Sequence, residues 1–189
     1  MSTEPAIKRH MLLLSISLLS TFNMAQCQQL FPKIYDAFYT YELPGVKTNV
    51  RLSSNGKGKV REEVTSGSGK SVTITDYANK LEYTIIYRAG LIVKRPLTKS
   101  FEEPSEASMK RKGGKYLGTK LIGGLQCQGW RFETPGSESE MWSEKNFSFI
   151  VLSKSKVQNK NYEMVLTKSS KDAPPSDLFE LPSGMQMSN

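Results

Sequence analysis

Histidine is almost absent from this sequence of 189 residues, in which His10 is the single imidazole. His10 borders a segment with the pattern of a cleaved signal peptide, so we expect the exported protein to contain no histidine. Without imidazole, the protein lacks the usual base of a serine or cysteine nucleophile and a common zinc ligand. The commonest hydrolases are therefore excluded, and we expect a non-catalytic protein with no cofactor and no metal site.

Cysteine is also scarce, since the chain has only Cys27 and Cys127. Two cysteines cannot form a disulfide framework, so the fold must depend on a hydrophobic core. Cys127 has no basic residue beside it except Arg131, four positions further on. This context favours a buried, inert thiol over a reactive one.

Only the N-terminal segment contains a long apolar run. Lys8, Arg9 and His10 precede the apolar residues 11–19, and a polar stretch follows at residues 23–29. This order is typical of a secretory signal, and the run is about half of the roughly twenty residues that a membrane-spanning helix needs. We therefore predict a signal peptide over residues 1–27 and one exported domain over residues 28–189.

Three fates remain open for Cys27. Small residues at Ala25 and Cys27 favour cleavage after Cys27, which would discard it. A cysteine after an apolar run also resembles a bacterial lipobox, which makes Cys27 a lipidation candidate, although Gln26 stands where that motif has glycine or alanine. In the third case Cys27 is retained as a thiol or paired with Cys127.

Positive charge exceeds negative charge, and the chain has a formal net charge of +8. Loss of residues 1–27, with Glu4, Lys8 and Arg9, would leave about +7. A basic surface favours anionic partners such as lipid headgroups, and possible association with a membrane surface follows. The simpler interpretation, which we favour over binding of lipid headgroups or nucleic acid, is that the lysines keep an exported sheet soluble and its edges unpaired.

Short alternating segments separated by turn residues dominate from about residue 34 onward. Residues 81–87 alternate large apolar side chains, residues 88–90 form a turn, and residues 91–95 make a second strand that ends at Pro96. This pattern predicts a β-hairpin, and about ten or eleven strands follow one another in this way. Such a meander must curl or close. We therefore expect a mainly β fold, a curved antiparallel sheet or incomplete β-barrel with at most one or two short helices.

The one expected interruption of the sheet is residues 101–115. Glutamates stand early in this segment and the basic residues 110–112 stand late, before Gly113 and Gly114. That charge order fits a short helix, because it complements the helix dipole. A disordered connection is the alternative, since Pro104 and the few apolar residues weaken the helical pattern.

Acidic pairs offer little chemistry. The candidate pairs are Glu62 with Glu63, Glu102 with Glu103, and Glu138 with Glu140. Neighbouring residues of a strand point to opposite faces, so only Glu138 and Glu140, two positions apart, would share a face. They lie in a segment rich in turn residues. A solvated charged face is the favoured interpretation over an acid/base pair.

Large apolar side chains recur at every second position of several predicted strands. Ordinary core packing explains each of them singly, whereas a curved sheet could leave a concave apolar cavity that holds a lipid-like ligand. The side chains predicted to form the apolar wall of such a cavity are Leu81, Tyr83, Ile85, Tyr87, Trp130, Phe132, Trp142 and Phe149.

Several motifs, in this order, resemble one protein family over residues 35–185. They are residues 58–62 (GKVRE), 74–76 (ITD), 80–83 (KLEY), 121–127 (LIGGLQC), 141–142 (MW) and 177–184 (DLFELPSG). The pattern is similar to that of the LolA/LolB-like lipoprotein-carrier superfamily of bacterial envelopes, in particular an uncharacterised branch. The resemblance implies an incomplete antiparallel barrel, helices over its concave face, and a lipid or lipoprotein ligand. We expect a periplasmic or outer-membrane-associated monomer.

Overall fold

The computed structural model describes residues 31–146 and 149–188. The predicted signal peptide and Cys27 lie outside these residues. The described residues form twelve strands, one α-helix and two short 3-10 helices. In chain order they are β1 (Tyr35–Leu43), β2 (Val46–Ser54), β3 (Lys59–Ser66), β4 (Gly69–Asp76), β5 (Leu81–Ile86), η1 (Tyr87–Ala89), β6 (Leu91–Pro96), α1 (Glu106–Arg111), β7 (Lys115–Ile122), β8 (Leu125–Thr134), β9 (Ser137–Glu144), β10 (Ile150–Val157), β11 (Lys160–Ser170), η2 (Ser176–Phe179) and β12 (Gln186–Ser188).

All twelve strands belong to one sheet, in the order β12-β6-β5-β4-β3-β2-β1-β11-β10-β9-β8-β7. A first meander, β1 to β6, runs from the middle of the sheet to one side. A second meander, β7 to β11, runs back from the other side until β11 pairs with β1. Neighbouring strands are antiparallel except β12, which is parallel to β6.

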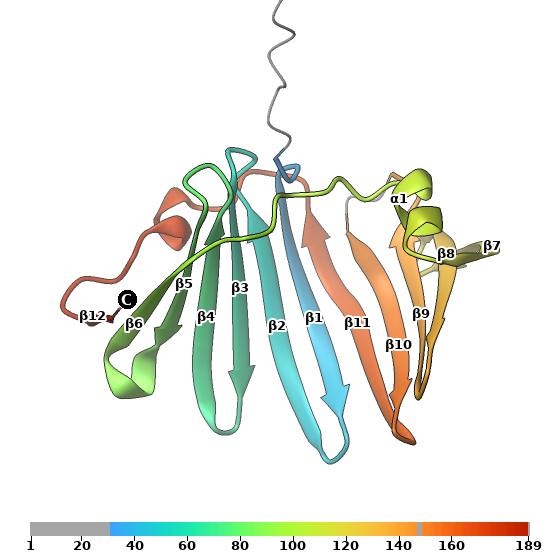
Figure 1. Ribbon diagram of the computed structural model, residues 1–189, viewed down its shortest axis with the longest axis horizontal. Helices are drawn as coiled ribbons and strands as arrows, with labels where there is room; N and C mark the ends of the chain where they lie inside the picture. The colour runs from blue at the N-terminus through green and yellow to red at the C-terminus, as the bar shows by residue number, and fades with distance from the viewer. Residues whose placement is uncertain (1–30, 147–148, 189) are drawn as a thin grey trace, which may run out of the picture.

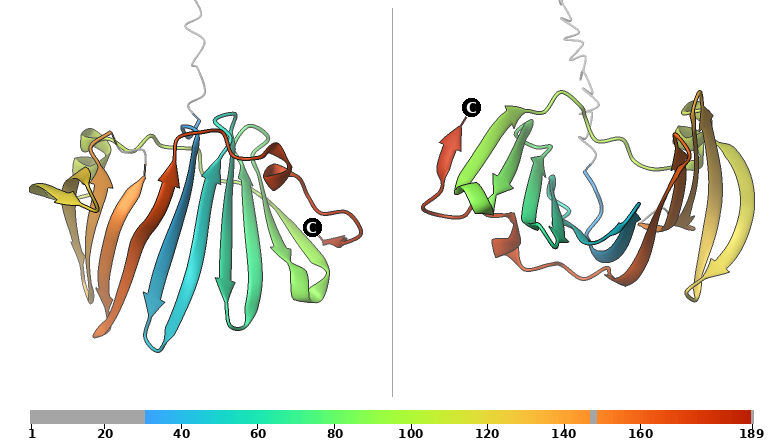
Figure 2. Two further views of the ribbon diagram at one scale, coloured as in Figure 1. Left: turned by 180° about the vertical axis from the view of Figure 1, so that it is seen from behind. Right: turned by 90° about the horizontal axis from the view of Figure 1, so that it is seen from below.

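The sheet bends into an open trough whose two sides do not meet (Figure 1). Because β6 and β7 lie on opposite sides, the chain between them must cross the open side of the trough. Residues 97–105, which we call the strap, make this crossing and lead into α1 (Figure 2). The prediction of a curved antiparallel sheet with one short helix is confirmed; β12 is the strand that the alternation did not indicate.

Near β1 and β2, the inner face of the trough carries the core. Ala37, Tyr39 and Val50 are buried together, and Tyr39 pairs with Val50 across the two strands. Directly paired residues share a face of the sheet. The outer face of the same strands is polar, since Arg51 donates two hydrogen bonds, of 2.9 and 2.8 Å, to the Asp36 carboxylate.

From β4 to β6 the buried apolar side chains occupy the outer face instead. Val60 and its partner Thr75 point to the inner face, so the next pair, Arg61 and Ile74, points outward. The buried cluster on this outer face consists of Val72, Ile74, Ile85 and Ile92.

The C-terminal segment covers this outer cluster. Leu181 and Met185 pack against it, and the Arg61 guanidinium donates a 3.1 Å hydrogen bond to the Leu178 carbonyl oxygen. Phe179 is buried in the same segment, and β12 then pairs with the edge of β6. The tail therefore supplies the layer that the outer apolar face needs for burial.

The helix α1 begins with a capping box. The Ser105 hydroxyl accepts from the backbone N–H of Ser108, and the Ser108 hydroxyl accepts from the backbone N–H of Ser105. Glu106 and Lys110 form an ion pair one turn apart, in the predicted order of charges. The helix buries Met109 against the inside of the trough.

Candidate ligand-binding cavity

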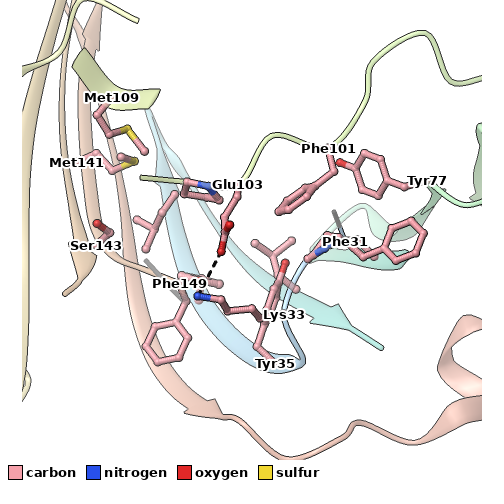
Figure 3. Close-up of a pocket in the computed structure, with 16 residues that line it drawn as sticks. Phe31, Lys33, Tyr35, Tyr77, Phe101, Glu103, Met109, Met141, Ser143 and Phe149 are labelled. Carbon is pink, nitrogen blue, oxygen red and sulfur yellow. Dashed lines mark ion pairs between the residues drawn. The ribbon is translucent and has the colours of Figure 1, made fainter. Parts of the chain in front are cut away.

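A cavity of about 250 Å³ lies on the inner face of the trough, beneath the strap (Figure 3). One wall comes from the central strands β1 to β3 and the other from β9 and the start of β10. The strap and α1 form the roof, and residues 31–33 close one end. The apolar and aromatic lining consists of Phe31, Pro32, Tyr35, Tyr39, Leu52, Val60, Tyr77, Phe101, Pro104, Met109, Met141, Phe149 and Ile150.

Burial dominates the electrostatics of the wall. Desolvation raises the pKa of Tyr35 to about 12, with smaller contributions from Tyr77 and Glu62. Desolvation also raises the pKa of Tyr39. Phenols shift in this direction where the surroundings disfavour charge. The cavity is thus a low-polarity environment suited to hydrocarbon.

The strap is fastened over the cavity by a few local contacts. The backbone N–H of Leu97 donates a 2.8 Å hydrogen bond to the Lys80 carbonyl oxygen, and the ring of Phe101 meets the ring of Tyr77 edge-on at 5.6 Å. At the mouth, Lys33 Nζ lies 3.4 Å from Glu103 Oε1, with side chains 60% and 46% exposed (Figure 3). An ion pair this exposed contributes at most about 1 kcal/mol, so the strap is held mainly by apolar packing.

Ser143 is the third polar side chain of the lining, beside Lys33 and Glu103. Ser143 is only 3% exposed, whereas the other two residues stand at the mouth. Among the described residues, its hydroxyl oxygen has no hydrogen-bond partner. The hydroxyl oxygen itself is buried within the wall, so the deep part of the cavity is lined by apolar surface.

The structure corrects the placement of the predicted wall residues on β5. Leu81, Tyr83 and Ile85 do share a face, as the alternation predicted, but it is the outer face. Tyr83 pairs with Ile74 and packs in the cluster that the C-terminal segment covers. Tyr87 lies in η1 and is 42% exposed. None of these four side chains lines the cavity.

The predicted residues on β8 and β9 are divided between the two faces. Trp130 pairs with Met141 and therefore points inward, where it is fully buried against the ring of Tyr116 without reaching the cavity. Trp142 follows Met141 and points outward, packed over Gly129, where a Cβ atom would lie 2.5 Å from the indole. The expectation that the large rings share one face is therefore wrong.

Two further predicted side chains approach the cavity more closely. Phe132 is on the inner face, where its ring lies against Gly114 after α1, but it does not line the cavity. Phe149 does line the cavity. Of the eight predicted wall residues, the structure thus brings only Phe149 to this site.

Sequence reasoning missed most of the actual wall. Tyr35, Tyr39, Leu52 and Met141 come from β1, β2 and β9. Tyrosine at every second position from residue 35 to residue 41, interrupted by Ala37, was a visible signal of one apolar face. The roof carried no such signal, because its position depends on the crossing from β6 to β7.

The structure also shows the surroundings of the cysteine and of the glutamate pair that the sequence analysis considered. Cys127 is fully buried, and burial raises the pKa of its thiol, as the prediction of an inert cysteine requires. Glu138 and Glu140 both lie within 3.5 Å of Arg131, as parts of a charged outer surface. No group of three or more His, Cys, Asp or Glu side chains within residues 31–146 and 149–188 could hold a metal ion.

The basic residues at the C-terminal end of α1 are paired with neighbouring glutamates. Arg111 and Lys112 both pair with Glu102, and Lys110 pairs with Glu106.

No helix within the described part of the chain combines the length and the apolar character needed to cross a membrane.

Comparison with known proteins shows the fold. The crystal structure of an uncharacterized conserved protein from Thermus thermophilus superposes with a TM-score of 0.65 at 12% sequence identity, covering 82% of this chain and 90% of that chain. The structure of MucB in complex with MucA(peri) superposes with a TM-score of 0.51 at 13% identity, covering 82% of this chain and 57% of that chain. This chain thus spans little more than half of MucB. No family model and no curated protein sequence matches it.

Proposed function

We propose that this chain is an exported, non-catalytic protein that holds an acyl chain of a lipid or lipoprotein in the cavity beneath the strap. The observation that carries the proposal is the cavity itself, a partly open apolar space between a curved sheet and a crossing segment. Burial of a large apolar side chain or an equivalent hydrocarbon segment contributes on the order of 1.5 to 3 kcal/mol. Hydrocarbon is therefore the ligand that this lining binds best.

The size of the cavity limits the ligand. Pockets for drug-sized ligands measure roughly 300–1,000 Å³, and this cavity measures about 250 Å³. It therefore accommodates one short acyl segment. A longer chain would extend past the Lys33 and Glu103 pair at the mouth, or displace the strap.

The motif resemblance to the LolA/LolB-like superfamily supports the proposal, because the carriers of that superfamily hold acyl chains in the concave face of an incomplete barrel. Export to the periplasm or the outer membrane belongs to the same proposal and rests on the signal-like residues 1–27. Lipidation of Cys27 would tether the domain to a membrane, and cleavage after Cys27 would release it.

A second candidate is an interaction protein that docks on a partner or on an anionic envelope surface through its basic residues. MucB, which shares the fold, is found in complex with MucA(peri). Docking through charge would weaken steeply with salt, whereas burial of an acyl chain would be nearly insensitive to it. Salt dependence of binding therefore separates the two candidates.

The proposal is tested with protein purified from its native membrane fraction. Mass spectrometry of this sample reports the cleavage site, any acyl group on Cys27 and any retained lipid together. We expect a lipid that leaves on denaturation, and saturable binding of an apolar fluorescent probe. Absence of both would contradict the proposal.

A matched pair of variants locates the binding. Met141→Trp fills the cavity and should weaken probe binding at least about tenfold, because an overpacked site cannot also hold a ligand. Leu121→Trp makes a similar change on the edge strand β7, where Leu121 is 75% exposed, and should leave binding unchanged. Val60→Trp, on the facing wall, serves as a second filling variant if Met141→Trp unfolds. Equal binding by the filling variants and the control would contradict the assigned cavity.

A further inference from the structure

The mouth of the cavity is bordered by loops from one end of the trough. The backbone N–H of Tyr77, between β4 and β5, donates a 2.8 Å hydrogen bond to the carbonyl oxygen of Gly58, between β2 and β3. A Cβ atom on Gly58 would lie 3.1 Å from the ring of Phe31, so the first described residues pack against the same loops. The strap also starts here, where Leu97 is hydrogen-bonded to Lys80. Figure 1 shows these segments together at one end of the sheet.

Three lysines on these segments, which we call the mouth lysines, are Lys57, Lys80 and Lys99. They come from the two loops and from the strap, and all three are exposed. None of them forms an ion pair with another described residue. Ile34, which is 40% exposed and packs against the loop between β2 and β3, adds an apolar side chain at the same end.

The carboxylates of the strap do not offset this positive charge. Glu103 is paired with Lys33 at the mouth, and Glu102 is paired with both Arg111 and Lys112. Each of these carboxylates already has at least one cation of its own. The mouth lysines therefore leave an uncompensated positive charge around the opening of the cavity.

An anionic lipid bilayer fits this end of the molecule. Its phosphate groups attract exposed lysines, and its interface accepts exposed apolar side chains. An acyl chain that left the bilayer through water would expose every methylene group on the way, which is unfavourable. A mouth placed against the bilayer avoids that exposure.

The chain outside the described residues points to the same end. Cys27, the lipidation candidate, stands four residues before Phe31, which lines the cavity near its mouth. An acyl anchor on Cys27 would hold the mouth within roughly 14 Å of the bilayer, because a residue spans at most about 3.6 Å.

We infer that the loop end of the trough docks on an anionic bilayer through the mouth lysines, so that the cavity opens directly onto the membrane. The inference rests on the proposed function for the nature of the ligand, and it adds the place from which that ligand enters. Docking here serves the acyl-binding cavity, whereas the second candidate function has docking in place of acyl binding.

The test measures cosedimentation of the full chain with vesicles of phosphatidylcholine, alone or mixed with phosphatidylglycerol. Cys27→Ser in every sample removes any acyl anchor and keeps the N-terminal segment the same throughout. We expect the wild type to prefer the mixed vesicles, with a preference that falls as salt is added. The combined variant Lys57→Gln, Lys80→Gln and Lys99→Gln should reduce this preference at least about tenfold, because each lysine near an anionic surface contributes about fivefold.

The matched control removes three positive charges from the opposite end, by Arg88→Gln, Lys156→Gln and Lys160→Gln. Arg88 lies in η1, and the two lysines flank the turn between β10 and β11 (Figure 1). All three are exposed and have no ion pair within the described residues. The control should keep the preference within about twofold, since charges a strand length from the bilayer lie beyond the Debye length.

A second readout connects docking with the cavity. It follows the transfer of a fluorescent acyl lipid from mixed vesicles to the protein. The mouth variant should slow this transfer at least about fivefold, in proportion to its lost docking, and the control should not. Both variants should bind the apolar fluorescent probe in solution as the wild type does, because none of the six substituted residues lines the cavity.

The outcomes separate the inference from the proposed function. Equal loss of preference in both variants, or a wild type that binds both kinds of vesicle equally, overturns the docking surface, while probe binding in solution keeps the cavity. Normal lipid transfer by a mouth variant that no longer docks overturns the opening onto the membrane. A wild type that does not bind the probe overturns the proposed function itself.

Discussion

The two halves of the sheet bury opposite faces. In β1 and β2 the buried side chains, such as Tyr39 and Val50, point into the trough, and a polar cluster around Asp36 points out. In β4 and β5 the buried side chains, such as Ile74 and Ile85, point out, and the threonines and Glu82 point in. The chain covers one half with its tail and the other with the strap. The segment that covers a face of the sheet therefore decides whether that face becomes the core. The alternation of apolar and polar residues along a strand does not decide it.

The largest expected effect comes from the outer cluster. Ile85→Ala truncates a fully buried side chain beneath the C-terminal segment. It should lower the free energy of unfolding by about 2–5 kcal/mol, because it removes apolar contact and leaves a cavity. Ligand affinity of the folded fraction should not change, since Ile85 does not line the inner cavity. Denaturant unfolding and probe binding below the transition measure both. A selective loss of affinity at full stability would reverse the assignment of the two faces.

A smaller effect is expected on the polar outer side of β1 and β2. Burial by itself raises the pKa of Asp36, but the hydrogen bonds from Arg51 and Ser53 outweigh it, so the pKa is lowered. A lowered pKa means that the carboxylate stabilises the fold above its unfolded pKa of about 3.9 and that this contribution is lost as pH falls through the folded value.

Asp36→Asn should therefore cost about 1.5–3 kcal/mol at neutral pH. The difference from the wild type should disappear in acid, which chemical denaturation at several pH values would measure. A difference that persists unchanged at low pH would show that the carboxylate charge is not the cause.

The smallest effect is expected on the polar inner side of β3. Burial, and then the neighbouring Glu82, raises the pKa of Glu62. A raised pKa favours the protonated group in the folded state, an advantage present below the unfolded pKa of about 4.3 and lost as pH rises through the folded value. Glu62→Gln should thus stabilise the protein at neutral pH by less than about 1 kcal/mol, because the group is partly exposed.

The gain from Glu62→Gln should vanish below about pH 3, where the wild-type carboxyl is protonated in both states. Thermal unfolding across this range is the measurement. Destabilisation at neutral pH would indicate instead that the carboxylate makes a favourable contact on the inner face.

The sequence predicted the strands because their alternation and turns are local. Leu81, Tyr83 and Ile85 were correctly assigned to one face of one strand. Which side of the trough that face would take depends on Leu181 and Met185, which lie about a hundred residues further on and pack against it. Local alternation does not contain that information.

The placement of the two tryptophans on opposite faces of the sheet could have been predicted from the sequence. The turn residues Pro135 and Gly136 connect β8 and β9, and Thr134 pairs with Ser137 across this two-residue turn. That register, counted back along both strands, pairs Trp130 with Met141 and so places Trp142 on the other face. The roof of the cavity was out of reach, because the path of the strap follows from the long-range pairing of β1 with β11.

Covalent mapping of the ligand tests the central claim most directly. An ester with a photoreactive group in its alkyl chain is bound to the full chain and irradiated, and the labelled peptides are identified by mass spectrometry with and without excess unlabelled ester. We predict competed labels on the inner wall and roof, at Tyr39, Met109 or Met141. Competed labels on the outer cluster around Tyr83 and Ile85, or labels that excess ester does not suppress, would contradict the account.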